Sequence, residues 1–296
     1  MRTLTTLLEG GSFFEGPRWH DGRWWVSDFY RGLVQAVDPD GRAEEVMQVP
    51  EAPSGLGWLP DGSLLVVSMA NRRMLRRSPD GEVTVHADLA DRVEFALNDM
   101  VVDAQGRAYV GNFGFDLMNG GFPATTSLFR VDPDGSVTEV ADGMMFPNGS
   151  VITPDGGTLI VGETGAGRYS AFTIAEDGSL SDRRVWAQVG EPAPIAPLGE
   201  MLEQLEFEPD GCCLDAEGCI WAADAKLGRC IRLAEGGEIL EEIPAGTGVF
   251  ACMLGGEDGR TLLMCLAPGF LAHERMGKSD AQLVTTQVDV PRAGLP

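Results

Sequence analysis

Residues 206–224 of the chain read EFEPDGCCLDAEGCIWAAD. In this stretch Asp210 precedes a turn glycine, Gly218, by eight positions, and the turn leads into a short apolar run that ends in a second carboxylate, Asp224. The same arrangement recurs along the chain. The stretch therefore belongs to an internal repeat, and the period of a repeat decides the architecture.

Six copies of a turn followed by an apolar strand share this pattern. Their turn glycines are 40, 44, 50, 62 and 41 residues apart, at Gly22, Gly62, Gly106, Gly156, Gly218 and Gly259. A second set of turns lies between them, at Asp40-Gly41, Asp80-Gly81, Asp134-Gly135, Asp177-Gly178 and Gly236-Gly237. Asp-Gly between apolar or β-branched runs indicates a hairpin, because glycine adopts the positive φ that tight hairpin turns require.

Two hairpins per period make four strands per repeat, which is typical of a propeller blade. The sequence therefore predicts an all-β fold, a six-bladed β-propeller with four-stranded antiparallel blades, built as a single domain over residues 1–296. The sixth repeat lacks its second hairpin. Lone strands in residues 3–8 and 282–290 are predicted to pair in that last blade, so that the N- and C-terminal strands close the ring and remove two exposed sheet edges.

Composition restricts the possible partners. The formal net charge is −23, which disfavours binding to nucleic acid or to an anionic membrane surface. No apolar run approaches the roughly 18 residues of a membrane span, and the first residues do not resemble a secretory signal, so a soluble, cytoplasmic protein is expected. The six cysteines are sparse for 296 residues and are expected to be buried, reduced thiols.

Residues at one phase of the repeat should converge, because the innermost strand of every blade lines the central channel. Counting back seven or eight positions from the first-turn glycines gives Glu15, Ser54, Asn98, Asn148, Asp210 and Ala251. Five of these six side chains carry oxygen, and carboxylates with carboxamides are ligands suited to a hard divalent cation. The alternative for any one of them is that an Asn or Asp before a turn caps its own backbone.

Four motifs in this order resemble the senescence marker protein / gluconolactonase family, which includes sugar lactonases. They are Glu15-Gly16-Pro17 with Trp19, Leu97-Asn98-Asp99, Phe146-Pro147-Asn148-Gly149, and Pro209-Asp210-Gly211. The resemblance spans nearly the whole chain and implies one catalytic divalent cation in the channel, with calcium expected and zinc, manganese or magnesium as alternatives. It also implies that Glu15, Asn148, Asp210 and Asn98 are metal ligands, and that Asn98 and Asp99 contact the substrate.

The chain departs from this family in one motif and has two long insertions. Many sugar-lactone members carry an arginine two residues before the asparagine, where this chain has Ala96. The segments 113–127 and 191–207 are rich in apolar residues and are predicted to lie on loops around the channel mouth. Either they bind a substrate with a less polar body and act as lids, or they simply pack against neighbouring blades.

The predicted function is the opening of a lactone, a small-molecule cyclic ester, by a metal-dependent hydrolase. In that interpretation the cation polarises the carbonyl and Asp210 is the general base. A serine triad is not indicated, because the chain has no G-x-S-x-G motif and its three histidines lie outside the shared phase of the repeat. Two alternatives remain, a non-catalytic binding propeller with a structural cation and a phosphotriesterase. The sequence leaves the oligomeric state open.

Overall fold

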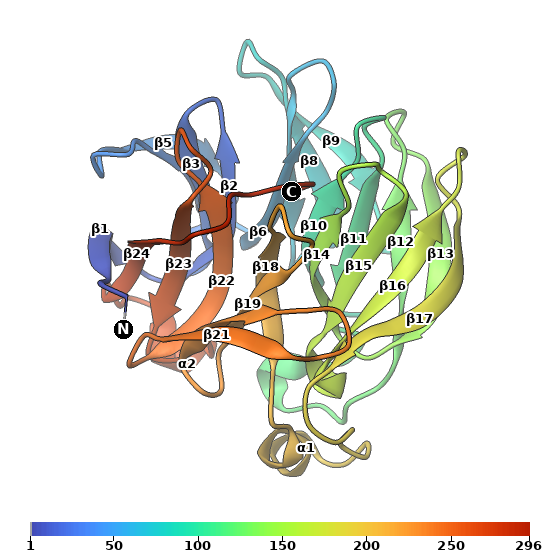
Figure 1. Cartoon of the computed structure of the whole chain (residues 1–296). Helices are drawn as coiled ribbons and strands as arrows, with labels where there is room; N and C mark the ends of the chain where they lie inside the picture. Colours follow the sequence, from blue (N-terminus) through green and yellow to red (C-terminus); the bar gives the residue numbers. More distant parts are fainter. Residues whose placement is uncertain (1) are drawn as a thin grey trace.

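The computed structural model describes residues 2–296 and consists of six four-stranded antiparallel sheets arranged as blades around one axis (Figure 1). Blade 1 comprises β2 (Phe14–His20), β3 (Arg23–Asp28), β4 (Leu33–Val37) and β5 (Ala43–Gln48). Blade 2 comprises β6 (Pro53–Trp58), β7 (Leu64–Ser68), β8 (Arg73–Arg77) and β9 (Val83–Asp88). Blade 3 comprises β10 (Leu97–Val102), β11 (Ala108–Asn112), β12 (Thr126–Val131) and β13 (Val137–Met144).

The second half of the chain repeats this order. Blade 4 comprises β14 (Pro147–Ile152), β15 (Thr158–Glu163), β16 (Arg168–Ile174) and β17 (Leu180–Gln188). Blade 5 comprises β18 (Pro209–Leu214), β19 (Ile220–Asp224), β20 (Arg229–Leu233) and β21 (Ile239–Pro244). Blade 6 comprises β22 (Gly248–Gly255), β23 (Thr261–Ala267), β24 (Ala281–Gln287) and β1 (Thr5–Gly11).

The first strands of the six blades form the wall of the central channel. Each of them contacts the first strand of the next blade, in the closed order β2, β6, β10, β14, β18, β22 and back to β2. The prediction of a six-bladed propeller is therefore confirmed. The predicted ring closure is confirmed too, because β1 pairs antiparallel with β24 from Thr5 opposite Thr285 to Gly11 opposite Ala281.

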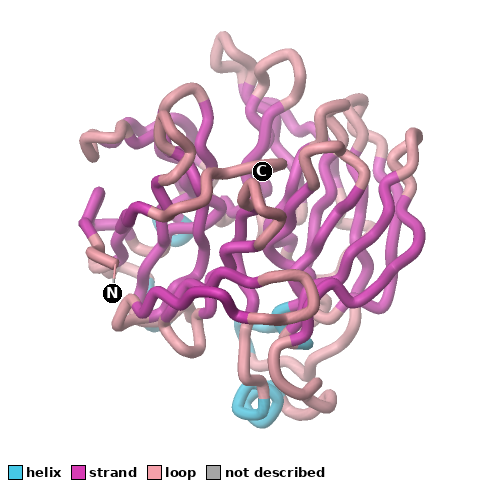
Figure 2. The backbone as a smooth tube through the Cα atoms, viewed as in Figure 1, coloured by secondary structure: helices cyan, strands magenta, loops and turns pink. Residues whose placement is uncertain are grey.

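Helices are few and short, as Figure 2 shows. They are α1 (Leu198–Gln204), α2 (Ala272–Arg275) and the 3-10 turns η1 (Phe29–Arg31), η2 (Leu117–Asn119) and η3 (Thr164–Ala166). The two α-helices lie at the same end of the propeller (Figure 1). Within residues 2–296, neither has the length and apolar character needed to cross a bilayer.

The last nine residues run across the opposite end of the propeller (Figure 1). Ala293 donates a backbone hydrogen bond to Leu214 in blade 5, and Leu295 exchanges two with Ile152 in blade 4. The chain end is thus tied to two further blades beyond the one that it completes.

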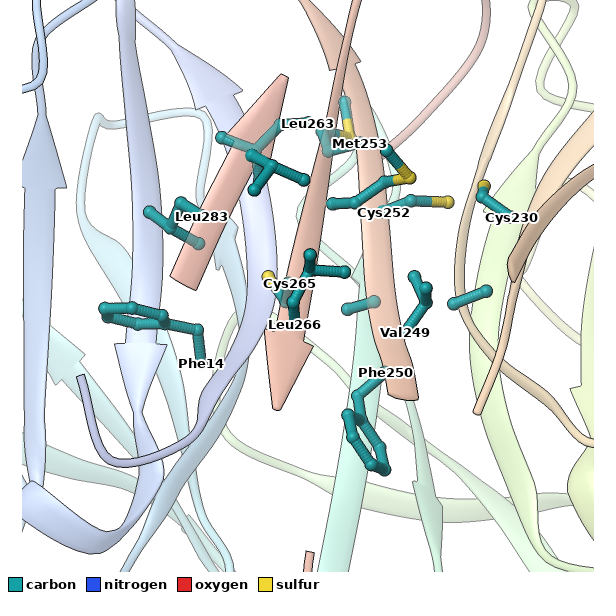
Figure 3. Close-up of a cluster of buried hydrophobic side chains, with 14 of the residues drawn as sticks. Phe14, Cys230, Val249, Phe250, Cys252, Met253, Leu263, Cys265, Leu266 and Leu283 are labelled. Atoms are coloured by element: carbon teal, nitrogen blue, oxygen red, sulfur yellow. The ribbon is translucent and has the colours of Figure 1, made fainter. Parts of the chain in front are cut away.

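The core is a set of apolar clusters between neighbouring sheets. The cluster around blade 6 includes Phe14, Phe250 and Leu283 (Figure 3). All six cysteines are buried and free, as predicted from their sparse spacing. Four of them, Cys213, Cys230, Cys252 and Cys265, belong to this cluster, where they fill space as small apolar side chains.

The glycines of the second hairpins also fit adjacent blades together. Gly135 has a φ of +85°, and a Cβ at this position would meet the carbonyl oxygen of His86 in the outer strand of the preceding blade. Gly41 and Gly237 lie in the same way against the carbonyl oxygens of Leu7 and Gln188. These turns therefore need glycine for two reasons, the backbone conformation and the close approach.

We expect Gly135→Ala to destabilise the protein by more than Gly156→Ala. Gly156 also has a positive φ, but a Cβ there would meet nothing within 4 Å. Its replacement should cost about 1–2 kcal/mol of the free energy of unfolding from backbone strain alone, whereas Gly135→Ala adds a clash with another blade. Denaturant unfolding of both variants measures the difference. Equal losses would mean that the contact with His86 does not constrain the fold.

Candidate functional site

The inner strands are interrupted at the same place in every blade. The register between the first and second strands shifts at each of these points, from Glu15/Arg18 in blade 1 to Val249/Ala251 in blade 6. An interruption of this kind turns a side chain out of the regular alternation of a strand. The dipeptides at or beside the six shifts are Glu15-Gly16, Ser54-Gly55, Asn98-Asp99, Asn148-Gly149, Asp210-Gly211 and Phe250-Ala251. In blade 1 the unpaired residues are Gly16 and Pro17, directly after Glu15, and in blade 6 Phe250 alone is unpaired.

The first residue of every one of these dipeptides lines a single cavity at the centre of the ring. The structure thus brings together Glu15, Asn98, Asn148 and Asp210, the four residues predicted as metal ligands. In blade 6 the residue at this place is Phe250, so the count that pointed to Ala251 is wrong by one position. The β22 segment has one more residue between the channel position and the turn glycine Gly259.

The second residue of each dipeptide faces the neighbouring inner strand. A Cβ on Gly16 would meet the backbone of Ser54, one on Gly149 would meet the backbone of Asp210 and Cys212, and one on Gly211 would meet Ala251. Glycine or alanine at these positions lets adjacent inner strands approach closely. The repeated Xaa-Gly pattern is therefore a packing requirement that also exposes one side chain per blade to the cavity.

Asp99 occupies the position that is glycine in four other blades. The residue is 4% exposed, and its carboxylate lies beside Gly55 and forms an ion pair of 2.7 Å with the guanidinium of Arg18. Arg18 also donates to the carbonyl oxygens of Leu56 and Met100, so it links the inner strands of blades 1, 2 and 3. Asp99, predicted from the resemblance to contact substrate, is not among the described residues that line the cavity.

Both asparagines direct an N–H of their carboxamides to the protein. Nδ2 of Asn98 donates to the carbonyl oxygen of Pro147 at 3.3 Å, and Nδ2 of Asn148 donates to Oγ1 of Thr164 at 3.1 Å. Thr164 in turn donates to the carbonyl oxygen of Pro209 at 2.6 Å. These bonds fix the amides in the orientation that leaves each Oδ1 available to a ligand, the usual role of groups that surround a metal site.

Ionisation of Glu15 and of Asp210 is costly, first because both carboxyl groups are buried. Burial and the charge of nearby Asp210 raise the pKa of Glu15 well above its ordinary value. Burial, followed by the charge of Asp99, raises the pKa of Asp210 to about 8. Two like charges in a poorly solvated site favour a bound cation, which would stabilise both ionised forms.

The donor set fits a hard divalent cation. Two carboxylates and two carboxamide oxygens are ligands that calcium accepts, with water or substrate completing a coordination shell of six to eight oxygens. Within residues 2–296 no three His, Cys, Asp or Glu side chains gather as a metal site of their own. The candidate site therefore depends on Asn98 and Asn148 as well as on Glu15 and Asp210.

A third carboxylate, Glu208, also lines the cavity and was not singled out from the sequence. Burial raises the pKa of Glu208 to about 7; the charge of Lys226 opposes this shift and that of Asp224 adds to it. Glu208 lies two residues before Asp210, outside the repeated dipeptide, so the repeat gave no signal for it.

The carboxylates at the ends of the second strands have a different role. Glu163 is fully buried and accepts hydrogen bonds from Arg168, Arg183 and Ser170, while Asp224 pairs with Arg229 at 2.8 Å. They tie strands together within their own blades.

The two long segments predicted to surround the mouth do so. Met118 in segment 113–127 and Leu202 in segment 191–207 both line the cavity. Leu198 of the second segment packs against the apolar cluster to which Phe115 and Leu117 of the first segment belong. Packing and lining of the cavity, posed as alternatives from the sequence, are thus both observed.

Comparison with known proteins finds relatives over most of the chain. A family model described as "SMP-30/Gluconolactonase/LRE-like region" matches residues 13–267. The chain is 28% identical over 260 residues to the pentonolactonase XacC of Haloferax volcanii, covering 86% of this chain and 81% of that protein. It is 25% identical over 289 residues to a 6-deoxy-6-sulfogluconolactonase of Pseudomonas putida, covering 91% and 88%.

A solved structure with a similar fold is a calcium-binding protein, regucalcin, from Agrobacterium tumefaciens. The TM-score is 0.79 at 20% sequence identity, and the match covers all of this chain and 97% of that one.

We expect Asp210→Asn to stabilise the metal-free protein, and more at pH 8 than at pH 5. The pKa of Asp210 rises from 3.8 to about 8 on folding, so its contribution to stability is greatest below pH 4 and is lost as the pH rises towards 8. The neutral amide avoids this loss. In chelator-treated protein the midpoint of thermal unfolding should rise by roughly 3–6 °C at pH 8.

The matched control for this measurement is Asp155→Asn. Asp155 is an exposed turn residue whose pKa is lowered by a hydrogen bond from Thr153, so its replacement should give no gain at pH 8. An equal gain for Asp210→Asn at both pH values would contradict the raised pKa that burial and the charge of Asp99 give to Asp210.

Asp99→Asn is expected to lower the free energy of unfolding by about 3–5 kcal/mol, because it leaves the buried Arg18 guanidinium without its anion. The double variant Arg18→Met/Asp99→Asn should lose less than the two single variants added together. Denaturant unfolding of all three variants gives the coupling. Strict additivity would show that the pair does not stabilise the channel.

Proposed function

The chain belongs to the SMP-30/gluconolactonase/LRE-like family, and we propose that it is a divalent-metal-dependent hydrolase that opens lactones. The observation that supports this most directly is the cavity floor, where two carboxylates and two pre-oriented carboxamides converge at the end of the channel. The two sequence relatives described above are both named as lactonases. The substrate is accordingly a small molecule.

Glu15, Asn98, Asn148 and Asp210 would hold the cation, for which calcium is the first candidate and zinc, manganese and magnesium are alternatives. When bound, the cation supplies Lewis-acid polarisation of the lactone carbonyl and stabilises the negative charge that develops on its oxygen. Glu15 and Asn148 serve only as ligands in this proposal. The hydrogen bond from Asn148 to Thr164 keeps its amide oxygen directed to the site.

Asp210 is the proposed general base. It takes a proton from a water molecule, whose oxygen then attacks the carbonyl carbon of the lactone. Collapse of the tetrahedral species breaks the bond between that carbon and the ring oxygen. The proton held by Asp210 passes to the ring oxygen, which leaves as a hydroxyl group, and the product is a hydroxy acid.

Asn98 and Asp99 orient the reaction in different ways in this proposal. One N–H of Asn98 is used by Pro147, and the second N–H of the same amide remains to donate to a bound carbonyl. Asp99 does not touch the substrate in this proposal. Its ion pair with Arg18 holds together the inner strands that carry Glu15 and Asn98. We therefore assign substrate contact to Asn98 and a positioning role to Asp99.

We expect chelator-stripped protein to hydrolyse lactones only after a divalent cation is restored, and Asp210→Asn to reduce the restored kcat by about 10²–10⁴-fold, the usual contribution of a general base. The measurement is acid release at constant pH, with Ca²⁺, Mg²⁺, Mn²⁺ and Zn²⁺ added singly. Asp155→Asn, in an exposed turn, is the control and should retain full activity.

Other outcomes would favour other functions. Faster turnover of phosphotriesters than of any lactone would indicate a phosphotriesterase. Tight cation binding by calorimetry without turnover of either class would indicate a binding propeller with a structural cation. Asp210→Asn with normal activity would rule out Asp210 as the base.

A further inference from the structure

The cavity has a polar floor and apolar walls. Its polar lining residues lie on the inner strands or directly beside them, at Glu15, Ser54, Asn98, Asn148, Thr164, Glu208 and Asp210. The remaining lining residues are all apolar: Phe13, Phe29, Met69, Phe113, Leu117, Met118, Phe146, Leu202, Ala225, Phe250 and Phe270. Among the described residues that line it, none is Lys, Arg or His.

The apolar walls are held in place by defined contacts. Phe13 packs edge-on against Phe250 with ring centroids 4.8 Å apart, and Phe113 packs edge-on against Phe146 at 4.9 Å. The carbonyl oxygen of Phe270 accepts a hydrogen bond of 2.5 Å from the hydroxyl of Tyr30. These contacts join walls that come from different blades.

The side chain of Lys226 holds helix α1 at the mouth of the cavity. Nζ of Lys226 donates to the carbonyl oxygens of Leu202, Glu203 and Leu205 at the end of this helix, where backbone acceptors are otherwise unpaired. Leu202 is thereby presented to the cavity by an anchored helix.

Exposed apolar side chains occur in the segments that line the cavity. Four segments each contribute one residue that lines the cavity and another that is largely exposed. The exposed members are Phe122 at 62%, Ile195 at 53%, Leu227 at 53% and Met276 at 67%, and their cavity-lining counterparts are Met118, Leu202, Ala225 and Phe270. The segments that carry the apolar walls thus also carry apolar side chains in contact with solvent.

A sugar lactone is poorly matched to these walls. Each of its ring hydroxyls would lose water on entry, and a buried polar group without a hydrogen-bond partner costs binding free energy. An anionic substrate is also disfavoured, because the cavity contains three carboxylates and the chain carries a net charge of −23. A neutral substrate with an apolar substituent avoids both the loss of hydrogen bonds to water and the repulsion by the carboxylates.

We propose that this site takes neutral lactones that carry an alkyl or aryl substituent, in preference to polyhydroxylated or anionic lactones. The ring ester meets the polar floor, and the substituent lies along the wall formed by Met118, Leu202 and Phe270. This inference rests on the proposed lactonase function, which it makes more specific.

The test compares kcat/KM for four lactones on the metal-loaded protein: δ-valerolactone, δ-decalactone, dihydrocoumarin and D-glucono-1,5-lactone. Burial of one methylene should raise kcat/KM about fourfold, so δ-decalactone should exceed δ-valerolactone on the order of 50-fold if three methylenes reach the wall. Dihydrocoumarin should likewise exceed the glucono-lactone. A glucono-lactone value equal to or above that of δ-decalactone would overturn the inference and leave lactone hydrolysis intact.

Substitution of the wall provides a second readout. Leu202→Gln and Met118→Gln should each lower kcat/KM for δ-decalactone by about tenfold, and by less for δ-valerolactone, which lacks the substituent. Both side chains are only partly buried, so the fold should tolerate the change. The matched control is Val185→Gln, an exposed apolar residue on the outer strand β17, which should alter neither value. Equal losses on both lactones would count against a wall that binds the substituent.

Binding of lactams tests which ligands the apolar walls prefer, independently of whether the protein hydrolyses lactones. Calorimetry with 6-pentyl-2-piperidinone and with glucono-δ-lactam measures affinity for analogues that resist hydrolysis. Tighter binding of the pentyl compound supports the inferred ligand class even if no lactone turns over, in which case the hydrolase proposal alone fails. Tighter binding of the sugar analogue overturns the inferred class.

Discussion

Close approach of the six inner strands is the constraint on which both the fold and the cavity depend. Where β2, β6, β14 and β18 meet their neighbours, the second residue of the interrupted dipeptide is glycine, and a side chain there would meet the next strand. The same interruption turns the first residue into the channel. A ring that packs tightly at its centre therefore presents one side chain from each blade to a common space.

Much of this arrangement could be predicted from the sequence. The Asp-Gly turns and their spacing were sufficient for six blades, because hairpin chemistry is local and the repeat is counted along the chain. Glu15, Asn98, Asn148 and Asp210 were found because one phase of the repeat must meet at the axis. The resemblance added roles for them that spacing alone does not provide.

The remaining features depend on contacts that cannot be found by counting positions along the repeat. Phe250 was missed because β22 has one additional residue before its turn, which shifts the count onto Ala251. The position of Asp99 depends on Arg18, which comes from another blade and has no partner defined by the repeat. Glu208 reaches the cavity from directly before β18, outside the repeated dipeptide, so only the folded chain shows that it belongs to the cavity.

The Arg18–Asp99 pair affects how small molecules can move along the central channel. Arg18, which lies on β2, is 3% exposed and donates hydrogen bonds to residues of two other inner strands, β6 and β10, while the C-terminal residues cross the far end of the propeller. In the described part of the chain, this buried pair therefore fills the space between the inner strands of blades 1, 2 and 3. A small molecule in the cavity cannot pass to the far end between these three strands unless the ion pair separates.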